Sequence, residues 1–281
     1  MRLEPLQNSE DELKKTAQLF SRVWPHNRRL DAAYLRWLYT QNPNGKALGF
    51  NAYEGEDLLA HYAVTPHMAE IHGELKTSAL SLNTAVDERV RGQGLFKKLA
   101  EKTYELAAGR GIDHVVGVAN AQSTHGFVKS LGFQLVTGLD TRFVMGAPHF
   151  RDSVAPLDWR RRWTAGELKW RLSQPHAQYA MQKVDSVIQV TGQTKYAHVI
   201  GILKIEREAK LQAAISLPTS AARRPLLWFG KTPYWKHFLS LSMPVWLRPS
   251  PFNMIFRDLS GNSRKLSSQA LHFEAADFDV L

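Results

Sequence analysis

A short stretch rich in glycine and arginine carries the clearest chemical signal in the sequence. It reads Arg-Val-Arg-Gly-Gln-Gly over residues 89–94, between an apolar run that predicts a strand, Leu80–Val86, and an amphipathic run that predicts a helix, Gly94–Ala108. Glycines let the main chain approach a ligand, successive N–H groups can point at phosphate oxygens, and a helix N-terminus favours negative charge. Arg89 and Arg91 would add positive charge. The stretch therefore predicts a phosphate-binding loop, with a glycine turn that binds nothing as the alternative.

Two common phosphate motifs do not fit these residues. Gly92 and Gly94 form G-x-G, but position 97 is Lys, so the dinucleotide fingerprint G-x-G-x-x-G is not present. No G-K-[ST] follows the glycines, which also excludes a P-loop.

The loop resembles the acyl-CoA pyrophosphate loop of the GCN5-related N-acetyltransferases, the GNAT superfamily. That pattern is Gln or Arg, two residues, Gly, one residue, and Gly or Ala, and Arg89, Gly92 and Gly94 match it. A second unit is also similar, a strand followed by Asn, a short helix and Gly-Phe, matched here by Asn120 and Gly132-Phe133. The resemblance covers roughly residues 4–145. It implies an α/β (α+β) fold in which a mixed, mostly antiparallel sheet splays at an acyl-CoA cleft.

By this resemblance acetyl-CoA is the co-substrate, and no metal is expected. A backbone N–H near Ala85 or Val86 would polarise the thioester carbonyl. Many relatives have a Tyr after the Phe of the second unit, and it protonates the departing thiolate; this chain has Val128 there. Another group or water would then supply the proton, or the reaction would proceed without an acid. The residues expected to contact acetyl-CoA are Ala85, Val86, Arg89, Arg91, Gly92, Gln93, Gly94, Leu95, Phe96, Asn120, Ser123 and Phe127.

Attack of an amine on a thioester releases a proton, so a base, often acting through water, is expected near the cleft. The candidates in the strands before the loop are Glu54, His61, His67 and Asp87, and Asn83 would orient the substrate or a water. Each histidine can instead be structural, and Asp87 can be a solvated surface residue. In some members of the superfamily the C-terminal carboxylate is the base, which here would be that of Leu281.

The first half of the chain must fold so that these residues meet. Ser9 and Glu12 form a capping box for a helix to about Val23, and Asp31 caps a second helix that ends before Asn42. Apolar runs separated by turn residues predict antiparallel strands that lead into the loop. The predicted strands are Leu48–Glu54, Leu58–Ile71, Leu75–Val86, His114–Ala119 and Phe133–Met145.

The second half resembles the opening of the first but lacks its loop. After a basic linker over residues 151–162, a capping box at Thr164 and Glu167 begins a helix whose Trp-Arg-Leu-Ser-Gln, residues 170–174, is similar to Trp-Leu-Tyr-Thr-Gln, residues 37–41. Strands are predicted at 177–183, 186–191 and 197–206, and a helix start at 230–233. We expect a domain 1–150 that binds acetyl-CoA and a domain 151–281 that is a degenerate GNAT-like half and walls the substrate site.

Composition limits the partners. The net charge of +10 is concentrated in the second half, with +1 over residues 1–145 and +9 over residues 146–281, which favours an anionic partner. The chain has no cysteine, so it has no thiol nucleophile and no zinc–thiolate site.

No signal peptide or membrane span is predicted, so a cytoplasmic location is expected. Nucleic acid is not an expected partner, because no such motif is present.

Two features leave alternatives open. Aromatic residues crowd region 228–256, which indicates a core and a loop, with a sugar-stacking wall or contact with a membrane surface as alternatives. The three arginines at 160–162 can grip phosphate or form a solvated face. The protein is expected to be a monomer or a homodimer.

The resemblance implies an N-acetyltransferase that acetylates a primary amine. The opening around Tyr34–Trp37 and Asn42–Gly45 is similar to that of GNAT proteins of cell-surface polysaccharide assembly, so an amino sugar or nucleotide-linked amino sugar is the predicted acceptor. A basic second half suits a phosphorylated molecule. The alternatives are a protein or peptide amine as acceptor, and an acyl-CoA-binding regulatory or scaffold protein without turnover.

Overall fold

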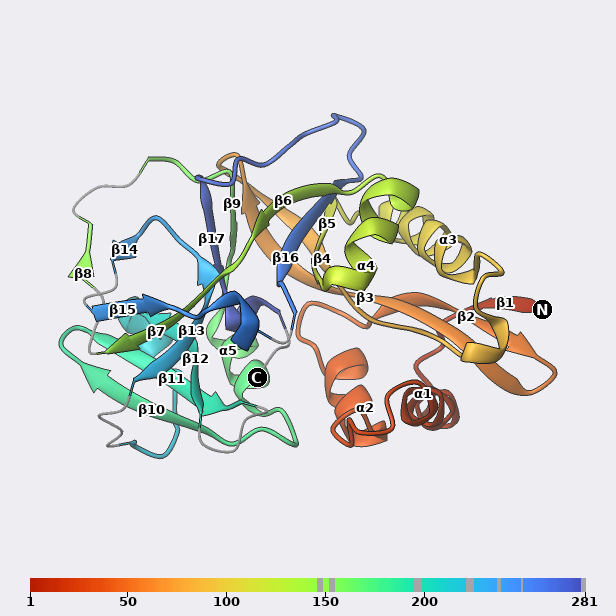
Figure 1. The fold of residues 1–281 in the computed structure, drawn as a ribbon, viewed down its shortest axis with the longest axis horizontal. Coiled ribbons are helices and arrows are strands. Elements are labelled where there is room, and N and C mark those ends of the chain that lie inside the picture. Colours follow the sequence, from red (N-terminus) through yellow and green to blue (C-terminus); the bar gives the residue numbers. More distant parts are fainter. Residues whose placement is uncertain are drawn as a thin grey trace.

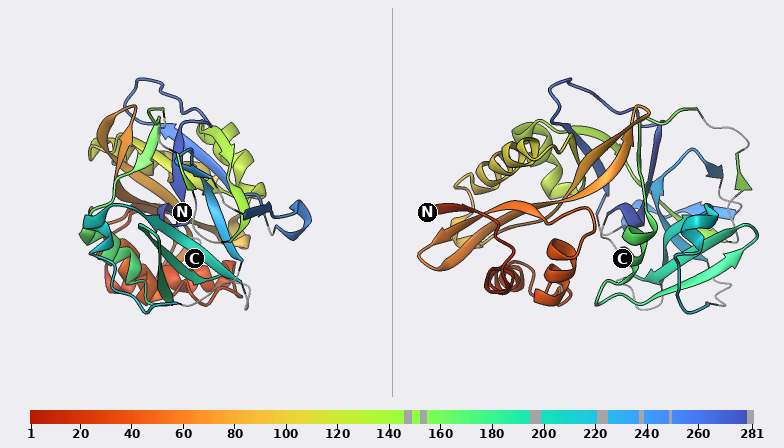
Figure 2. Two further views of the ribbon diagram at one scale, coloured as in Figure 1. Left: turned by 90° about the vertical axis from the view of Figure 1, so that its left-hand side faces the viewer. Right: turned by 180° about the vertical axis from the view of Figure 1, so that it is seen from behind.

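Two halves of similar construction share continuous β-structure in the computed structural model (Figure 1). The structure describes residues 1–145, 149–151, 155–194, 199–220, 225–236, 239–248 and 250–278. The sheet of the first half lies between two layers of helices, with α1 and α2 on one face and α3 and α4 on the other (Figures 1 and 2).

The elements of the first half follow the order expected from the sequence. The structure confirms the two N-terminal helices, the meander of three strands, the helix after the glycine loop and the strand that follows it. In chain order they are β1 (Arg2–Pro5), α1 (Glu10–Val23), α2 (Ala32–Thr40), β2 (Leu48–Glu54), β3 (Asp57–Ile71), β4 (Glu74–Val86), η1 (Glu88–Val90), α3 (Leu95–Gly109), β5 (His114–Ala119), α4 (Ala121–His125), η2 (Gly126–Ser130), β6 (Gln134–Gly138) and β7 (Asp140–Met145).

Two details of this half differ from the prediction. The expected single strand 133–145 is divided at Leu139, whose N–H donates to Phe252 O; β6 pairs with β16, and β7 pairs with β13 and β15. The capping box at Ser9 is only half formed. Ser9 accepts the N–H of Glu12, but the Glu12 carboxylate accepts the N–H groups of Gln7 and Asn8 instead of that of Ser9.

The second half begins with the elements that the sequence repeat predicted. Thr164 and Glu167 form the complete capping box. The elements are β8 (His149–Phe150), β9 (Trp159–Arg161), α5 (Ala165–Leu172), β10 (Tyr179–Val184), β11 (Val187–Gln193), β12 (Ile200–Glu206), α6 (Ala209–Gln212), β13 (Leu226–Lys231), β14 (Trp235–Lys236), β15 (Leu239–Ser242), η3 (Val245–Leu247), β16 (Asn253–Asp258), β17 (Leu271–Glu274) and η4 (Ala275–Asp277).

Two predictions in this half were wrong. The helix start at residues 230–233 does not form, because Gly230 continues β13 and pairs with Glu274 and Asp140. The stretch 159–161 is strand β9 and not part of a linker, since it pairs with β3 and β17. Residues 152–154 of the predicted linker and residues 197 and 198 of a predicted strand lie outside the described residues.

The two halves repeat one strand pattern. β2, β3 and β4 form an antiparallel meander and β4 then pairs parallel with β5; β10, β11 and β12 do the same, and β12 pairs parallel with β13. Each third strand also carries one extra residue, between Leu82 and Ala85 in β4 and between Ile202 and Lys204 in β12. The repeat proposed from residues 37–41 and 170–174 therefore extends through four strands.

The halves also exchange a strand. β16, from the second half, lies between β5 and β6 of the first, and β7, from the first half, lies between β13 and β15 of the second (Figure 1). Each half therefore completes its sheet with a strand from the other half. The predicted boundary at residue 150 divides the repeat, while the backbone hydrogen bonds of both sheets cross it.

Candidate active site

The centre of the candidate site is the place where β4 and β5 stop pairing, which we call the opening. The two strands pair only from Ser78 with His114 to Ser81 with Gly117, and residues 82–86 of β4 have no partner in β5. The Asp87 N–H donates to Leu59 O of β3. Because successive N–H groups of an extended strand point to opposite edges, the Val86 N–H points to the open edge.

The glycine loop closes one end of this opening. Gly92 and Gly94 have φ values of +80° and +71°, which residues other than glycine rarely adopt. Gly94 is the N-cap of α3, and no side chain caps that helix, so its first-turn N–H groups are left for a ligand. Arg91, Gln93 and both glycines are exposed at the surface of the loop.

Asp87 anchors this loop. Its buried carboxylate accepts hydrogen bonds from the Arg89 side chain at 3.0 and 2.9 Å and from Arg22 Nε at 3.0 Å. The Arg89 guanidinium, and then Arg22, hold the pKa of Asp87 well below its usual range, despite the opposing effect of burial. A carboxylate with two guanidinium partners is a poor proton acceptor, so these contacts argue against Asp87 as the base.

The predicted apolar contacts line the α3–α4 side. Leu95 is buried, and Phe96 stacks edge-on against Phe127, with ring centroids 5.1 Å apart. Asn120 and Ser123 are brought together as a capping box of α4, so part of their hydrogen-bonding capacity is used locally. Val128 lies in the single π-helical turn η2. The second half reaches this place too, because Asn253 donates to Thr124 Oγ1.

The opposite side of the opening holds Asn83, in the bulge of β4. Its φ is +54°, and its side-chain Nδ2 donates to the Tyr39 hydroxyl at 3.2 Å. Tyr39 Oη is 2.9 Å from His61 Nε2, and His61 Nδ1 is 2.7 Å from Asn51 Oδ1. Asn51 Nδ2 in turn donates to the Glu12 carboxylate. A buried chain of five side chains therefore ends at the cleft.

The network assigns every proton in this chain. Asn51 donates to Glu12 through Nδ2, so its Oδ1 accepts from His61 Nδ1–H, and the free Nε2 of His61 accepts from the Tyr39 hydroxyl. Burial lowers the pKa of His61 from 6.5 to about 3, so its imidazole is neutral. His61 has no nitrogen facing a substrate, which argues for a positioning role.

Three members of this chain, Glu12, Asn51 and Tyr39, were missed from the sequence. Asn51 is polar at a strand position between apolar neighbours, which is the available signal. The other candidates lie elsewhere. Glu54 is exposed at the β2–β3 turn, and His67 is buried beside Trp159 with a pKa lowered by burial. The C-terminal carboxylate lies outside the described residues.

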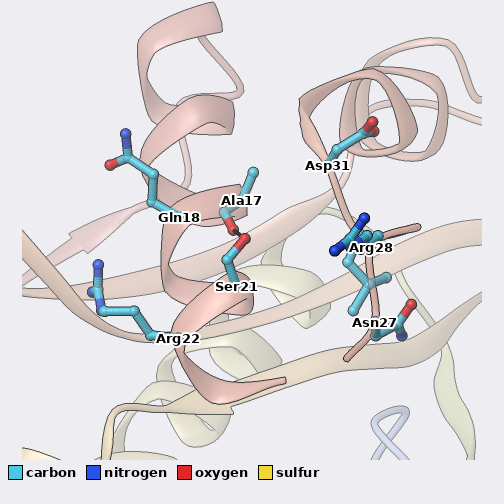
Figure 3. A pocket seen from close by; sticks show the side chains of 8 residues that line it. Ala17, Gln18, Ser21, Arg22, Asn27, Arg28 and Asp31 are labelled. Carbon is cyan, nitrogen blue, oxygen red and sulfur yellow. Dashed lines mark hydrogen bonds between the residues drawn. The ribbon is translucent and has the colours of Figure 1, made fainter. Parts of the chain in front are cut away.

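A shallow depression lies beside α1, on the α1–α2 side (Figure 3). It encloses about 430 Å³ and is lined by residues of α1 and of the turn before α2, among them Arg22, Arg28 and Asp31. Arg22 links the depression to Asp87, and Asp31 contacts His176 of the second half at 2.9 Å. Its lining residues lie in α1 and just before α2, the helix that carries Tyr39.

The second half has an equivalent opening, and its own chain fills it. β12 and β13 pair only at residues 201 and 202 with 227 and 228, and β17 and η4 occupy the space beyond. Counting from the bulge, Ile205 corresponds to Val86 and Glu206 to Asp87. The Ile205 N–H donates to the Glu274 carboxylate at 3.3 Å. An acceptor oxygen therefore occupies the position that is open at Val86.

Within the described ranges, no group of three or more His, Cys, Asp or Glu side chains is arranged to hold a metal ion. None of the helices in this part of the chain combines the length and apolar character that a membrane span needs.

Comparison with known proteins identifies the first half. Residues 5–136 match the sequence profile of the family described as Acetyltransferase (GNAT) domain. A search of curated proteins gave no match. The profile covers just under half of the chain, so the match concerns the first half only. This half contains the whole candidate site except for the contacts made by residues 176, 250 and 253.

Solved structures share the fold over nearly the whole chain. They include a probable N-acyltransferase of unknown function from Enterococcus faecalis V583 (11% identity, 92% of this chain and 73% of that one, TM-score 0.59). A GCN5-related N-acetyltransferase from Kribbella flavida matches likewise (12%, 92% and 71%, TM-score 0.57). A putative acetyltransferase from Pyrococcus horikoshii has 9% identity over 96% of this chain and 92% of that one, with a TM-score of 0.53. Residues 5–136 therefore match the acetyltransferase (GNAT) domain family, and the chain shares the fold of these solved structures.

Proposed function

We propose that this protein transfers the acetyl group of acetyl-CoA to a small primary amine, with acetyl-CoA held between β4 and β5. One observation supports this most directly. The opening at Val86 is free, while the equivalent opening of the second half is filled and its N–H is bonded to a carboxylate. The fold thus keeps one oxygen-binding N–H unsatisfied beside a glycine loop suited to phosphate.

In this proposal each side of the cleft has one task. The loop residues Arg91, Gly92 and Gly94 and the first turn of α3 hold the pyrophosphate, and Asp87 keeps Arg89 in place. Phe96 and Phe127, with Asn120 and Ser123, border the pantetheine. The Val86 N–H stabilises the negative charge that develops on the thioester oxygen as the amine attacks.

Asn83 is the proposed contact for the acceptor amine. Its Nδ2 is held by Tyr39, so its Oδ1 is oriented to accept an N–H of the amine. During transfer a C–N bond forms, the C–S bond breaks and the amine loses a proton. Because Asp87 is ion-paired and His61 is buried and neutral, we infer that water in the cleft carries this proton away. Val128 cannot protonate the thiolate, which leaves that step to water as well.

An amino sugar, free or nucleotide-linked, is the proposed acceptor. The stretch Tyr34–Trp37, which carries the likeness to polysaccharide-associated GNAT proteins, lies in α2, the helix that also supplies Tyr39. The acceptor-side position of α2 is therefore consistent with a role in recognising the acceptor. The excess positive charge of the second half suits a phosphorylated acceptor.

A non-catalytic acyl-CoA-binding protein is the second candidate, and Val128 in place of a hydroxyl group is the observation that favours it. Calorimetric titration of acetyl-CoA into wild type and Gly92→Trp tests the cofactor site. Release of free thiol with glucosamine, UDP-glucosamine, a peptide and a polyamine tests turnover. Binding that Gly92→Trp abolishes, with turnover of a sugar amine, supports the proposal. Binding without turnover of any amine supports the second candidate, and no binding contradicts both.

A further inference from the structure

A second hollow with strongly basic walls lies in the second half, at the end of β12. It encloses about 390 Å³, within the range of roughly 300–1,000 Å³ typical of small-molecule sites. We call it the basic pocket. Its charged and aromatic walls are formed by Phe150, Arg160, Arg161, Arg162, Trp163, Lys204, Glu206, Arg207, Glu208, Tyr234 and His272.

The positive charges of the basic pocket are only partly neutralised. Arg160 and Arg162 share one oxygen of Glu70, at 2.8 and 3.8 Å. Arg207 stacks over the Phe150 ring at 4.1 Å and has no carboxylate within 4.0 Å among the described residues. The deeper Lys204 lies between Glu206 and Glu274 and is fully compensated. Arg161 lies 3.7 Å from Glu167, and Glu208 also lines the pocket, so the surplus positive charge is confined to guanidinium groups at the rim.

Two lining residues of the basic pocket also have a hydrogen-bond donor that is not used in the described part of the chain. Arg161 is buried and stacks on Trp163, and its Nε has no hydrogen-bond partner within the described residues. Tyr234 Oη accepts from Arg160 Nη1 at 3.0 Å, so its own hydroxyl proton is left to donate. A buried unpaired N–H lowers stability unless a hydrogen-bond acceptor satisfies it.

We propose that the basic pocket binds a small molecule that carries a phosphate group. Guanidinium groups match the geometry of phosphate oxygens, and several donors on different strands can surround a tetrahedral anion. The volume exceeds that of phosphate alone, and Phe150 and Tyr234 offer flat faces to the rest of the ligand. The pocket lies at the mouth of the filled opening, so the half that has lost its acyl-CoA cleft keeps an anion site. This proposal does not depend on acetyl transfer.

Titration calorimetry with inorganic phosphate and with UMP tests the proposal. The variant Arg162→Gln/Arg207→Gln removes two rim charges, and Lys169→Gln/Lys210→Gln removes two exposed charges outside the pocket. We expect saturable binding of at least one probe, a Kd raised at least tenfold in the arginine variant, and a change below twofold in the lysine variant. Unchanged acetyl-CoA affinity in both variants controls for folding.

Three results would overturn the proposal. The first is the absence of saturable binding of either probe. The second is an equal weakening in the arginine and lysine variants, which would show a general effect of net charge. The third is a Kd that rises in Gly94→Ala but not in Arg162→Gln/Arg207→Gln, which would place the phosphate on the glycine loop of the first half.

Discussion

Trp37 and Trp170 hold the two halves together through a reciprocal contact. Their rings stack with centroids 4.9 Å apart, Trp37 Nε1 donates to Trp170 O at 2.9 Å, and Trp170 Nε1 donates to Trp37 O at 3.1 Å. The same residue of the repeat therefore makes the same contact from both sides. Such reciprocity is the signature of a two-fold relation, here within one chain.

This contact predicts a large effect of truncating the first tryptophan. Trp37 is 3% exposed, so Trp37→Ala should lower the free energy of unfolding by about 3–5 kcal/mol, since the stacked ring and the hydrogen bond donated by its own indole are lost. Trp246, 82% exposed, gives the matched control, and Trp246→Ala should change the value by less than about 0.5 kcal/mol. Urea titration followed by circular dichroism measures both. Similar losses in the two variants would contradict the structural role of the stack.

The strand exchange predicts that the halves do not fold separately. Residues 1–150 produced alone lack β16, which leaves the facing edges of β5 and β6 unpaired. We expect this fragment to be insoluble or to lack a cooperative thermal transition, and co-production with residues 151–281 to restore both. A fragment 1–150 that melts cooperatively and binds acetyl-CoA would show instead that the predicted domain is autonomous.

The glycine loop can be tested against a second glycine whose substitution introduces the same backbone strain outside the loop. Gly94→Ala and Gly73→Ala both place a methyl group at positive φ, +71° and +83°, with nothing within 4 Å of the new Cβ. Each should cost about 1–2 kcal/mol of stability. Gly94→Ala alone should weaken acetyl-CoA binding, by at least tenfold, because it shifts the N–H groups at the start of α3. Calorimetry compares them, and equal affinities would remove the loop from the site.

The hydrogen bond between Asn83 and the Tyr39 hydroxyl predicts a kinetic effect confined to the acceptor amine. Tyr39→Phe removes the hydroxyl that holds Asn83 and leaves the ring stacked on His61, at a centroid distance of 5.7 Å. We expect kcat/KM for the amine to fall roughly tenfold, in line with the loss of about 1.4 kcal/mol of positioning, with the KM for acetyl-CoA unchanged. Tyr53→Phe is the control, because the Tyr53 hydroxyl bonds to Asn51 and Glu12 at the other end of the same chain of side chains. A parallel change in both KM values would assign Tyr39 to general stability.

His61 predicts a pH effect on stability of definite sign. Its folded pKa of about 3 lies below its ordinary value of 6.5, so the unfolded chain binds the proton more tightly. This contribution to stability is complete above pH 6.5 and is lost as the pH falls toward 3. Between pH 6.5 and 5.5 wild type should lose about 1 kcal/mol more than His61→Gln in urea titrations. Parallel pH profiles would contradict a buried neutral imidazole.

The sequence predicted the elements that short patterns specify. Ser9, Asp31 and Thr164 mark three helix starts correctly, because a cap acts within one turn. The sequence also located the glycine loop, because Arg89, Gly92 and Gly94 lie within six residues of one another. The division of strand 133–145 at Leu139 could not be predicted, since each part is specified by a partner more than 80 residues away. The helix expected at 230–233 failed because Glu274, distant in sequence, extends the strand.

The candidate site shows the same limit. Arg89, Gly92 and Gly94 lie together in sequence and were predicted together. The chain from Glu12 through Asn51, His61 and Tyr39 to Asn83 draws on two helices and three strands, so spacing alone gave only two of its members. Asp87 was expected as a base because its type allows that role; only the fold brings Arg22, 65 residues earlier, to its carboxylate.

The place of β16 also sets the order in which the protein can be assembled. β5 ends at residue 119, and the strand that covers its free edge begins at residue 253. During synthesis the edge of β5 opposite β4 stays uncovered until residues 253–258 have left the ribosome. Contacts so distant in sequence form slowly and leave a strand edge available to other chains in the meantime. Newly made protein therefore depends on β16 both to complete the sheet around the candidate site and to avoid aggregation.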